Sequence, residues 1–357
     1  MASRISGFEN SIFSEISALA RQHGAVNLGQ GFPDFDGPDS LKRSAQEAIH
    51  SGKNQYAQSQ GEPELRRAIA EHSKRFYPSF GWEVPFAKAI GAGGKPLGRH
   101  AQLAGGIPVA VTLHAPDFRF NPIELSTAFT PKTKAIIINT PHNPAGTVFT
   151  HQELIMIAEL CQEYDVLAIT DEVYEHIIFS EAQHRRIAAI PGMENRTLTI
   201  SSAGKTFSFT GWKVGWTIGA AELQTAIRRI HQFTVFATAT PFQYASADGL
   251  RLGDEYYKEL SEDYESRRDY LMDVLTRVGL EPTKPEGAYF IMANIEKYGK
   301  NPDEFCEWLI KEIGVAAIPP KTLYLHAKDA APYVRFTFCK KWETLHAAAE
   351  RLMKLGG

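Results

Sequence analysis

The chain has 357 residues, of which 43% are hydrophobic and 22% are charged, a composition typical of folded globular proteins and not of disordered or fibrous ones. Its 38 lysines and arginines nearly balance its 41 aspartates and glutamates, so the net charge is −3. This balance argues against a nucleic-acid partner or a polybasic membrane contact, because binding to phosphates needs a concentrated positive surface.

The sequence also predicts a cytoplasmic protein. Its first residues, MASRISG, lack the apolar core of a secretory signal. No run of about 18 uncharged apolar residues is present that could span a membrane. Three widely spaced cysteines form no C-x-x-C pair, which favours a reducing compartment; they are Cys161, Cys306 and Cys339.

Three short apolar runs organise the middle of the chain, at residues 135–138, 166–169 and 197–200. Runs of this length without polar alternation are typical of strands buried on both faces of a parallel sheet. Between the first two runs, Thr150 and Glu153 have the spacing of a capping box, and apolar residues follow at helical spacing. We therefore predict a β-α-β unit with a right-handed crossover and helices on both faces of the sheet.

The C-terminal third has a different pattern, in which helices and short strands are mixed. The expected elements are a long charged helix over about 255–278, a strand near 288–292, a helix over about 302–313, strands at 314–318 and 333–338, and a last helix that contains Leu345 and Leu352. This mixture predicts a smaller α+β domain beside the parallel sheet.

Polar residues follow each of the three central runs. Asn143 comes after the first, Asp171 and Tyr174 after the second, and Ser202 and Lys205 after the third. Ligands of open α/β sheets bind at the carboxyl ends of the strands, so we expect these side chains to share one site. They match the needs of pyridoxal phosphate, which requires a lysine amine for its aldehyde, an anion for its pyridine nitrogen and hydrogen-bond donors for its ring oxygen.

Other site chemistries have less support in the sequence. No H-x-x-x-H or H-E-x-x-H group occurs among the twelve histidines, so no metal site is predicted. No G-x-G-x-x-G follows a strand, which disfavours a nicotinamide dehydrogenase. Arg335 is flanked by apolar residues, and an arginine there is costly to bury unless an anion meets it. A substrate carboxylate is such an anion.

Seven segments, taken in order and spacing, resemble the fold-type I aminotransferases of classes I and II. Within that family they are most similar to the kynurenine–oxoglutarate, glutamine–phenylpyruvate and methionine aminotransferase branch. The segments are NLGQGFPDF (27–35), NQY (54–56), NTPHNP (139–144), TDEVY (170–174), SSAGKTFSFTGWKVGW (201–216), GVAAIP (314–319) and VRFTFC (334–339).

The resemblance implies an α/β fold of the fold-type I transferases. Its large domain, at residues 46–244, would bind pyridoxal phosphate on a mostly parallel sheet, and a smaller α+β domain would combine residues 1–45 with 245–357. The implied activity moves the amino group of an L-amino acid to a 2-oxo acid such as 2-oxoglutarate. The donor would be of aromatic, kynurenine, methionine or glutamine type.

The same resemblance implies a role for each site residue. Lys205 would bind the cofactor covalently and move the proton, and Asp171 would keep the pyridine nitrogen charged. The remaining implied contacts are ring-oxygen donors at Tyr174 and Asn143, phosphate ligands at Ser202 and Lys213, and a substrate-carboxylate site at Arg335, Asn143 and the Gly31 backbone. Tyr56 would reach the phosphate of the neighbouring subunit, which implies a homodimer.

The chain departs from the family around residues 83–103, where the family carries several tens more residues. In the family these include a loop that receives the phosphate and an aromatic residue that stacks on the pyridine ring. The glycine-rich run at 91–95 could be a replacement phosphate loop, since glycine amides can cradle an anion. A simple join between the two flanks explains the segment with fewer assumptions, and we favour it.

Two other functions use the same fold. One is an inactive paralogue that keeps the dimer but holds cofactor poorly. The other is carbon–sulfur β-elimination on cysteine conjugates, which would also use Lys205.

Overall fold

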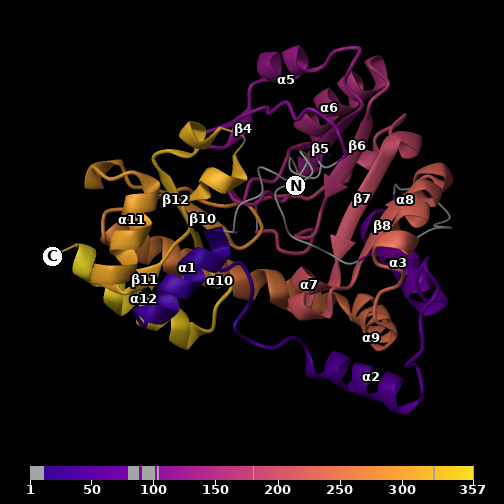
Figure 1. Ribbon diagram of the computed structural model, residues 1–357, viewed down its shortest axis with the longest axis horizontal. Coiled ribbons are helices and arrows are strands. Elements are labelled where there is room, and N and C mark those ends of the chain that lie inside the picture. Colours follow the sequence, from indigo (N-terminus) through magenta and orange to yellow (C-terminus); the bar gives the residue numbers. More distant parts are fainter. Residues whose placement is uncertain are drawn as a thin grey trace, which may run out of the picture.

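A computed structural model describes residues 12–78, 88–90, 101–102, 104–179, 181–324 and 326–356. Its largest sheet has five strands in the order β2-β8-β7-β6-β5 (Figure 1). The three apolar runs form its β5 (Ala135–Asn139), β6 (Leu167–Asp171) and β7 (Thr197–Ser202), and these strands are parallel. The predicted parallel strands are therefore confirmed, and each ends at its polar residues.

The other edge of this sheet was not predicted from the sequence. Strand β8 (Gly215–Gly219) runs antiparallel to β7, and β2 (Lys88–Ile90) pairs antiparallel with β8. β2 belongs to the unusual segment 83–103, which we interpreted as a simple join without assigning an element to it. The run at 91–95, with both of its interpretations, lies outside the described residues.

Helices cover the sheet as the β-α-β pattern requires. Thr150 and Glu153 form the predicted capping box at the start of α6 (His151–Glu163). Apolar residues of α6 pack under the sheet in a core that includes Ile138 and Ala168. The other helices of this region are α3 (Pro63–Phe76), α5 (Pro122–Ala128), α8 (Ala221–Thr234), and the neighbouring pair α2 (Asp39–His50) and α9 (Thr240–Leu250). A short hairpin, β3 (Leu113–His114) with β4 (Arg119–Phe120), precedes α5.

The C-terminal third has the predicted mixture of helices and strands. A three-stranded antiparallel sheet has the order β12-β10-β9, and β1 pairs in parallel with β11. Two N-terminal elements join this region, α1 (Ile12–Gln22) and β1 (Val26–Asn27). Its own elements are α10 (Asp254–Arg277), β9 (Glu281–Pro282), β10 (Phe290–Asn294), α11 (Pro302–Trp308), β11 (Val315–Ala316), β12 (Tyr333–Thr337) and α12 (Trp342–Leu352). The predicted helix over 302–313 changes into a π-helical turn at Leu309–Ile313.

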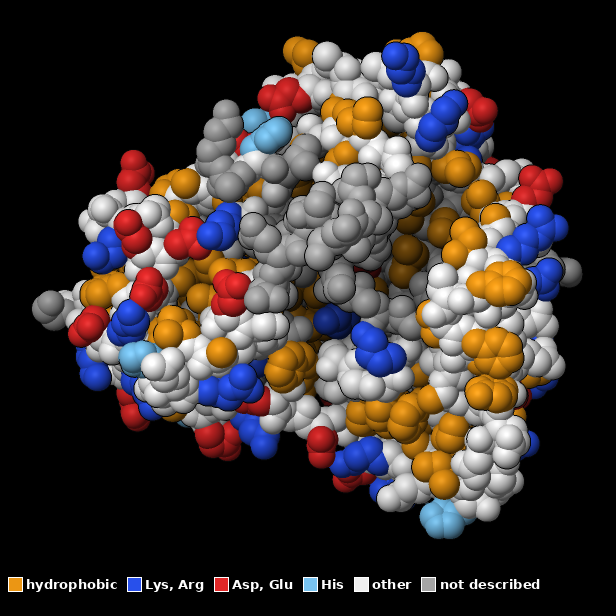
Figure 2. Space-filling view, in the orientation of Figure 1, with side chains coloured by type: hydrophobic (Ala, Val, Ile, Leu, Met, Phe, Trp, Pro, Cys, Tyr) orange, Lys and Arg blue, Asp and Glu red, His pale blue; other side chains and the backbone are white. Residues whose placement is uncertain are grey.

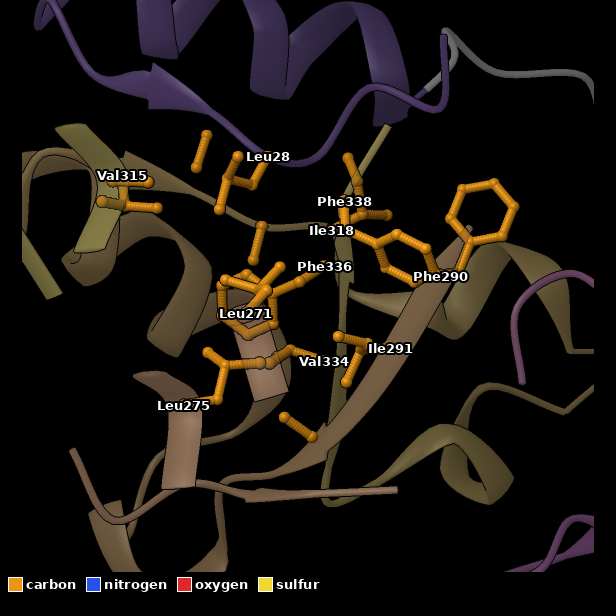
Figure 3. Packing of buried hydrophobic residues seen from close by; sticks show 14 of the residues in the cluster. Leu28, Leu271, Leu275, Phe290, Ile291, Val315, Ile318, Val334, Phe336 and Phe338 are labelled. Carbon is orange, nitrogen blue, oxygen red and sulfur yellow. The ribbon is translucent and has the colours of Figure 1, made fainter. Parts of the chain in front are cut away.

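A single apolar core joins these elements. Leu271 and Leu275 of α10 pack against Ile291 of β10 and against Val334 and Phe336 of β12 (Figure 3). Buried residues from the loop after β6 belong to the same core, namely Tyr174, Ile177 and Phe179. The end of β6 therefore touches both parts of the molecule. The domain division at residues 45 and 245 stays a prediction.

Within the described ranges, no helix is both long and apolar enough to cross a bilayer.

Candidate active site

Lys205 lies on α7 (Ala203–Thr206), a one-turn helix that follows β7 directly. Its Nζ is 5.7 Å from the ring centroid of Tyr174 and 5.6 Å from that of Tyr289. Burial lowers the pKa of Lys205 below its ordinary value, although the charge of Asp171 opposes this. A lowered pKa makes the neutral, nucleophilic amine more accessible near pH 7.

Asp171 is the last residue of β6, and its Oδ1 accepts a hydrogen bond of 3.3 Å from the Val173 N–H. Burial raises the pKa of Asp171 to about 6, against the effects of that N–H and of the Lys205 charge. A carboxylate in this position gains from any cation brought next to it.

Asn139 links the ends of β5 and β6. Its Nδ2 donates to the Asp171 carbonyl at 2.9 Å, and its Oδ1 accepts from the Asn143 N–H at 2.8 Å. The loop after β5 is thereby held beside the end of β6. This puts Asn143 within reach of Arg335 on β12.

Arg335 of β12 is 1% exposed. It donates to Asn143 Oδ1 at 2.8 Å and to the Gly29 carbonyl at 2.9 Å, and its Nε has no hydrogen-bond partner among the described residues. The guanidinium lies 4.2 Å from the Phe290 ring centroid. Burial lowers the pKa of Arg335 to about 10. A buried guanidinium without a carboxylate is ready to receive an anion.

Gly31 lies next to this group. Its carbonyl accepts from the Tyr289 hydroxyl at 2.9 Å, and a Cβ at this position would come within 2.8 Å of the Phe290 ring. A larger residue would therefore displace the loop or the ring. The Tyr289 ring also meets Tyr174 edge to face at 5.1 Å. Burial raises the pKa of Tyr174, so its hydroxyl stays protonated and able to donate.

The three remaining expected site residues differ in how far they are buried. Ser202 is buried at the end of β7, one residue before α7. Lys213 is exposed, but its charge contributes to the lowered pKa of Lys205. Tyr56 is 84% exposed, and its ring contacts Phe236 at 5.0 Å on the outer surface. The fold thus brings together the expected residues except Tyr56.

Some site residues were not singled out from the sequence. Asn139 is the first residue of the motif NTPHNP (139–144). Its position at the end of a predicted strand could have identified it as a site residue. Tyr289 and Phe290 had no local signal, because the pairing of β10 with β12 brings them to Arg335.

A second buried polar cluster lies behind the strand ends. Glu172, Glu175 and His184 have ligand-type atoms within 4.8 Å of one another, a spacing that could hold a metal ion. Arg186 forms ion pairs with Glu172 at 3.1 Å and Glu175 at 2.7 Å. The guanidinium supplies the positive charge that a metal would otherwise bring.

Comparison with known proteins gives the family. A model of the family "Aminotransferase class I and II" matches residues 97–352. The methionine aminotransferase of Escherichia coli K12 is 37% identical over 380 aligned positions that cover 99% of this chain and 98% of the relative. The chain is a class I and II aminotransferase. Kynurenine–oxoglutarate transaminase 1 of Rattus norvegicus is 36% identical over 415 positions, covering 99% and 97%.

Solved structures of the family have the same fold as this aminotransferase. The N-succinyldiaminopimelate aminotransferase of Mycobacterium tuberculosis superposes with a TM-score of 0.93 at 37% identity, over 99% of this chain and 100% of the other. The E. coli methionine aminotransferase gives a TM-score of 0.91 at 35% identity, with 99% of each chain covered. The alignments are longer than the 357 residues of this chain, so these relatives carry residues with no counterpart here.

The family uses pyridoxal phosphate, and the donor set of the aminotransferase fits that cofactor. A buried lysine of lowered pKa suits the aldehyde, and a buried carboxylate of raised pKa suits a protonated pyridine nitrogen. The Asn143 amide and the protonated Tyr174 hydroxyl can each donate a hydrogen bond. When bound, the cofactor supplies an aldehyde that takes up an amine and a ring that accepts electrons from the α-carbon.

Proposed function

We propose that this aminotransferase moves the amino group of an L-amino acid with an aromatic, kynurenine, methionine or glutamine type side chain to a 2-oxo acid such as 2-oxoglutarate. One observation carries the proposal. The buried Lys205 amine and the Asp171 carboxylate lie beside a buried arginine, Arg335, which pairs with no carboxylate among the described residues.

Each residue then has a defined task. Arg335 binds the α-carboxylate in a two-pronged contact, with the Gly31 backbone close by and Asn143 fixing one prong. Lys205 takes the proton from the α-carbon of the substrate and delivers it to C4′, the aldehyde carbon of the cofactor. Its buried amine is easily neutralised and can therefore accept a proton. Asp171 keeps the pyridine nitrogen protonated. Ser202 and Lys213 hold the phosphate.

The donor class follows from the surroundings of Arg335. Its guanidinium faces the rings of Phe290 and Phe13, at 4.2 and 5.3 Å. Among the described residues, the other buried arginines already pair with carboxylates; they are Arg186, Arg267 and Arg268. An uncharged donor side chain suits this site better than an acidic one. Relatives named for methionine and kynurenine support the same choice.

A donor panel tests the proposal. The purified chain, saturated with pyridoxal phosphate, is given 2-oxoglutarate and one of methionine, phenylalanine, kynurenine, glutamine, aspartate or N-succinyl-diaminopimelate. Formation of glutamate is followed by chromatography (with glutamine, the 2-oxo product is followed instead). We expect turnover with the uncharged donors and at least tenfold lower kcat/KM with the acidic ones.

Lys205→Ala is the matched variant for this panel. We expect it to bind the cofactor without a borohydride-reducible link and to lose transamination by at least about a thousandfold, the scale of a lost proton-transfer group. Undiminished turnover by Lys205→Ala, or a preference for the acidic donors, would contradict the proposal. Release of pyruvate and ammonia from a cysteine conjugate, without glutamate formation, would instead favour the β-lyase.

We also infer a homodimer in which Tyr56 acts in the neighbouring subunit's site. Tyr56 is accompanied on the surface by exposed apolar side chains of α8 and the loop after it: Ile230 (66%), Phe233 (85%), Val235 (49%) and Phe236 (51%). We call Tyr56 and these four residues together the α8 patch. Figure 2 shows hydrophobic side chains at the surface along the side of the molecule that α8 and α9 form. Exposed apolar patches of this kind commonly mark interaction surfaces.

Sedimentation equilibrium tests the dimer. We expect the wild type to sediment as a dimer and Phe233→Glu to sediment as a monomer, because a charge in the middle of an apolar interface is left without a partner. Glu222→Lys, on the exposed start of the same helix, is the control and should remain dimeric. Tyr56→Phe should stay dimeric but bind pyridoxal phosphate about tenfold more weakly. A wild type that is monomeric at micromolar concentration would refute this inference.

A further inference from the structure

We propose that Lys340 is a positioning residue that holds the substrate-side loop 28–32 in the shape needed to receive the α-carboxylate. The inference rests on the proposed function for the location of that carboxylate. Lys340 follows β12 by three residues and is 4% exposed. Its Nζ donates to the carbonyls of Gln30 at 3.1 Å and Phe32 at 2.8 Å.

These two carbonyls flank Gly31. One ammonium group therefore bridges the loop on both sides of the residue whose backbone faces the Tyr289 and Phe290 rings. A bridge of this kind fixes the orientation of the intervening peptide units. In the described part of the chain, no oxygen accepts the Gly31 N–H, which leaves that donor available to a ligand.

The rest of the loop is held in the same way, by donors to its carbonyls. The Leu28 carbonyl accepts from the Thr337 N–H at 2.8 Å, and the Gly29 carbonyl accepts from Arg335 at 2.9 Å. The Gly31 carbonyl accepts from Tyr289 at 2.9 Å. Every carbonyl from 28 to 32 thus has a donor from the C-terminal region. Occupied carbonyls keep their negative ends away from an incoming carboxylate.

The chemistry of Lys340 indicates a purpose beyond packing. Among the described residues no carboxylate pairs with it, and its Nζ also lies 5.0 Å from the centroid of the Phe32 ring. Burying an ammonium without a counter-ion costs stability. A methionine would fill similar volume without that cost. What methionine cannot supply is the pair of hydrogen bonds to the loop.

The test compares Lys340→Met and Lys340→Gln with Lys341→Met, which removes a charge from the exposed neighbouring lysine. Two readouts are independent of turnover. The first is the Kd of 3-phenylpropionate, a carboxylate without an amine, measured by calorimetry on the cofactor-loaded protein. The second is hydrogen exchange of peptides that cover residues 28–32, followed by mass spectrometry.

We expect Lys340→Met to raise the KM for the amino donor and the Kd for 3-phenylpropionate about tenfold, with kcat and cofactor affinity changed less than about twofold. Exchange in the loop should become faster. Lys340→Gln keeps one donor and should lie between Lys340→Met and the wild type, and Lys341→Met should match the wild type. If Lys340→Met is too unstable to purify, Lys340→Gln alone decides.

Unchanged KM and Kd in Lys340→Met or Lys340→Gln would overturn the inference, even with faster exchange, since the lysine would then only brace the loop. Failure of the proposed function would look different. The wild type would then show no transamination with any donor, while the Kd for 3-phenylpropionate and the exchange rates would still report on Lys340.

Discussion

Arg186 and Arg335 are both buried, with 2% and 1% of their surfaces exposed, but the groups around them differ. Arg186 lies among Glu172, Glu175 and the Tyr77 ring, whose centroid is 3.8 Å from the guanidinium. Arg335 lies among carbonyls, an amide and aromatic rings, and no carboxylate of the described part of the chain pairs with it. The two arginines are equally buried, but Arg186 is surrounded by negative charges and Arg335 by neutral groups.

The two pKa values express this difference. Burial alone would lower the pKa of Arg186, but Glu175, Tyr77 and Glu172 raise it above its ordinary value. Burial lowers the pKa of Arg335 to about 10, and nearby tyrosines only partly oppose it. A buried arginine that forms ion pairs with carboxylates of the same chain stabilises the fold. A buried arginine without such an ion pair indicates a site for an anionic ligand.

The Arg186 cluster connects elements that carry site residues. Ser201 of β7 donates to Glu175 at 2.6 Å, and Tyr77, after α3, donates to the same carboxylate at 2.9 Å. Glu172 directly follows Asp171 and accepts from the Thr170 hydroxyl at 2.9 Å. The cluster therefore ties the ends of β6 and β7 together behind the face that carries Asp171 and Lys205.

The largest effect on stability is expected from Arg186→Met. It leaves Glu172 and Glu175 buried without a cation, and removing one partner of a buried ion pair typically costs about 3–5 kcal/mol. We expect that loss in the free energy of unfolding, measured by urea denaturation of the cofactor-free protein. Arg335→Met in the same assay should change it by less than about 1 kcal/mol. Equal losses in both variants would show that the two arginines are alike in their structural role.

For catalysis we expect a large effect from the Arg335 substitution, which has the smaller effect on stability. Arg335→Met removes the cation that meets the α-carboxylate, and losing one partner of a buried charged contact costs about 2–5 kcal/mol. We expect kcat/KM for the amino donor to fall about a hundredfold or more, with cofactor affinity nearly unchanged. Arg335→Lys should recover little, because an ammonium cannot make the two-pronged contact. A kcat/KM within tenfold of the wild type would place the carboxylate elsewhere.

The predictions agree with the structure for those features that depend on residues close together in the sequence. The apolar runs before Asn143, Asp171 and Lys205 predicted buried parallel strands, and the carboxyl-end rule then gathered the polar residues. The capping box of α6 was likewise local. Motif resemblance added the family, and the apolar residues that flank Arg335 indicated an anion partner for it.

What the sequence did not predict depends on contacts between distant segments. Tyr289 meets Gly31 across 258 positions, and Lys340 reaches Gln30 across 310. Neither contact leaves a periodic or spacing signal. The Arg186 cluster was missed for the same reason, because Ser73, Glu175 and Ser201 converge on it from three elements. Strand β8 was missed because its Gly-Trp pattern lacks the apolar run of the parallel strands.

The last and smallest effect concerns the buried carboxylate of Asp171, whose burial outweighs the effects of the Val173 N–H and the Lys205 charge. Burial raises its pKa from 3.8 to about 6 in the cofactor-free protein, so between these pH values the folded state binds more protons than the unfolded chain. Stability must then fall as the pH rises through this window, and the penalty is complete above about pH 6. Asn cannot ionise, so Asp171→Asn avoids it.

We therefore expect cofactor-free Asp171→Asn to exceed the wild type in stability by about 1–3 kcal/mol at pH 7.5, and the difference to shrink toward zero near pH 4. The buried His176, whose pKa burial lowers to about 4, weakens both proteins as the pH falls below 6.5 and cancels in the comparison. Urea denaturation at pH 4.5, 6 and 7.5 measures the difference, with the same substitution at an exposed aspartate of α9, Asp248→Asn, as the control. Adding pyridoxal phosphate should stabilise the wild type more than Asp171→Asn, because only the carboxylate can pair with a protonated pyridine. An Asp171→Asn variant that is no more stable than the wild type at pH 7.5 would mean that the fold already neutralises this carboxylate, and that the contrast with the matched Arg186 cluster does not extend to Asp171.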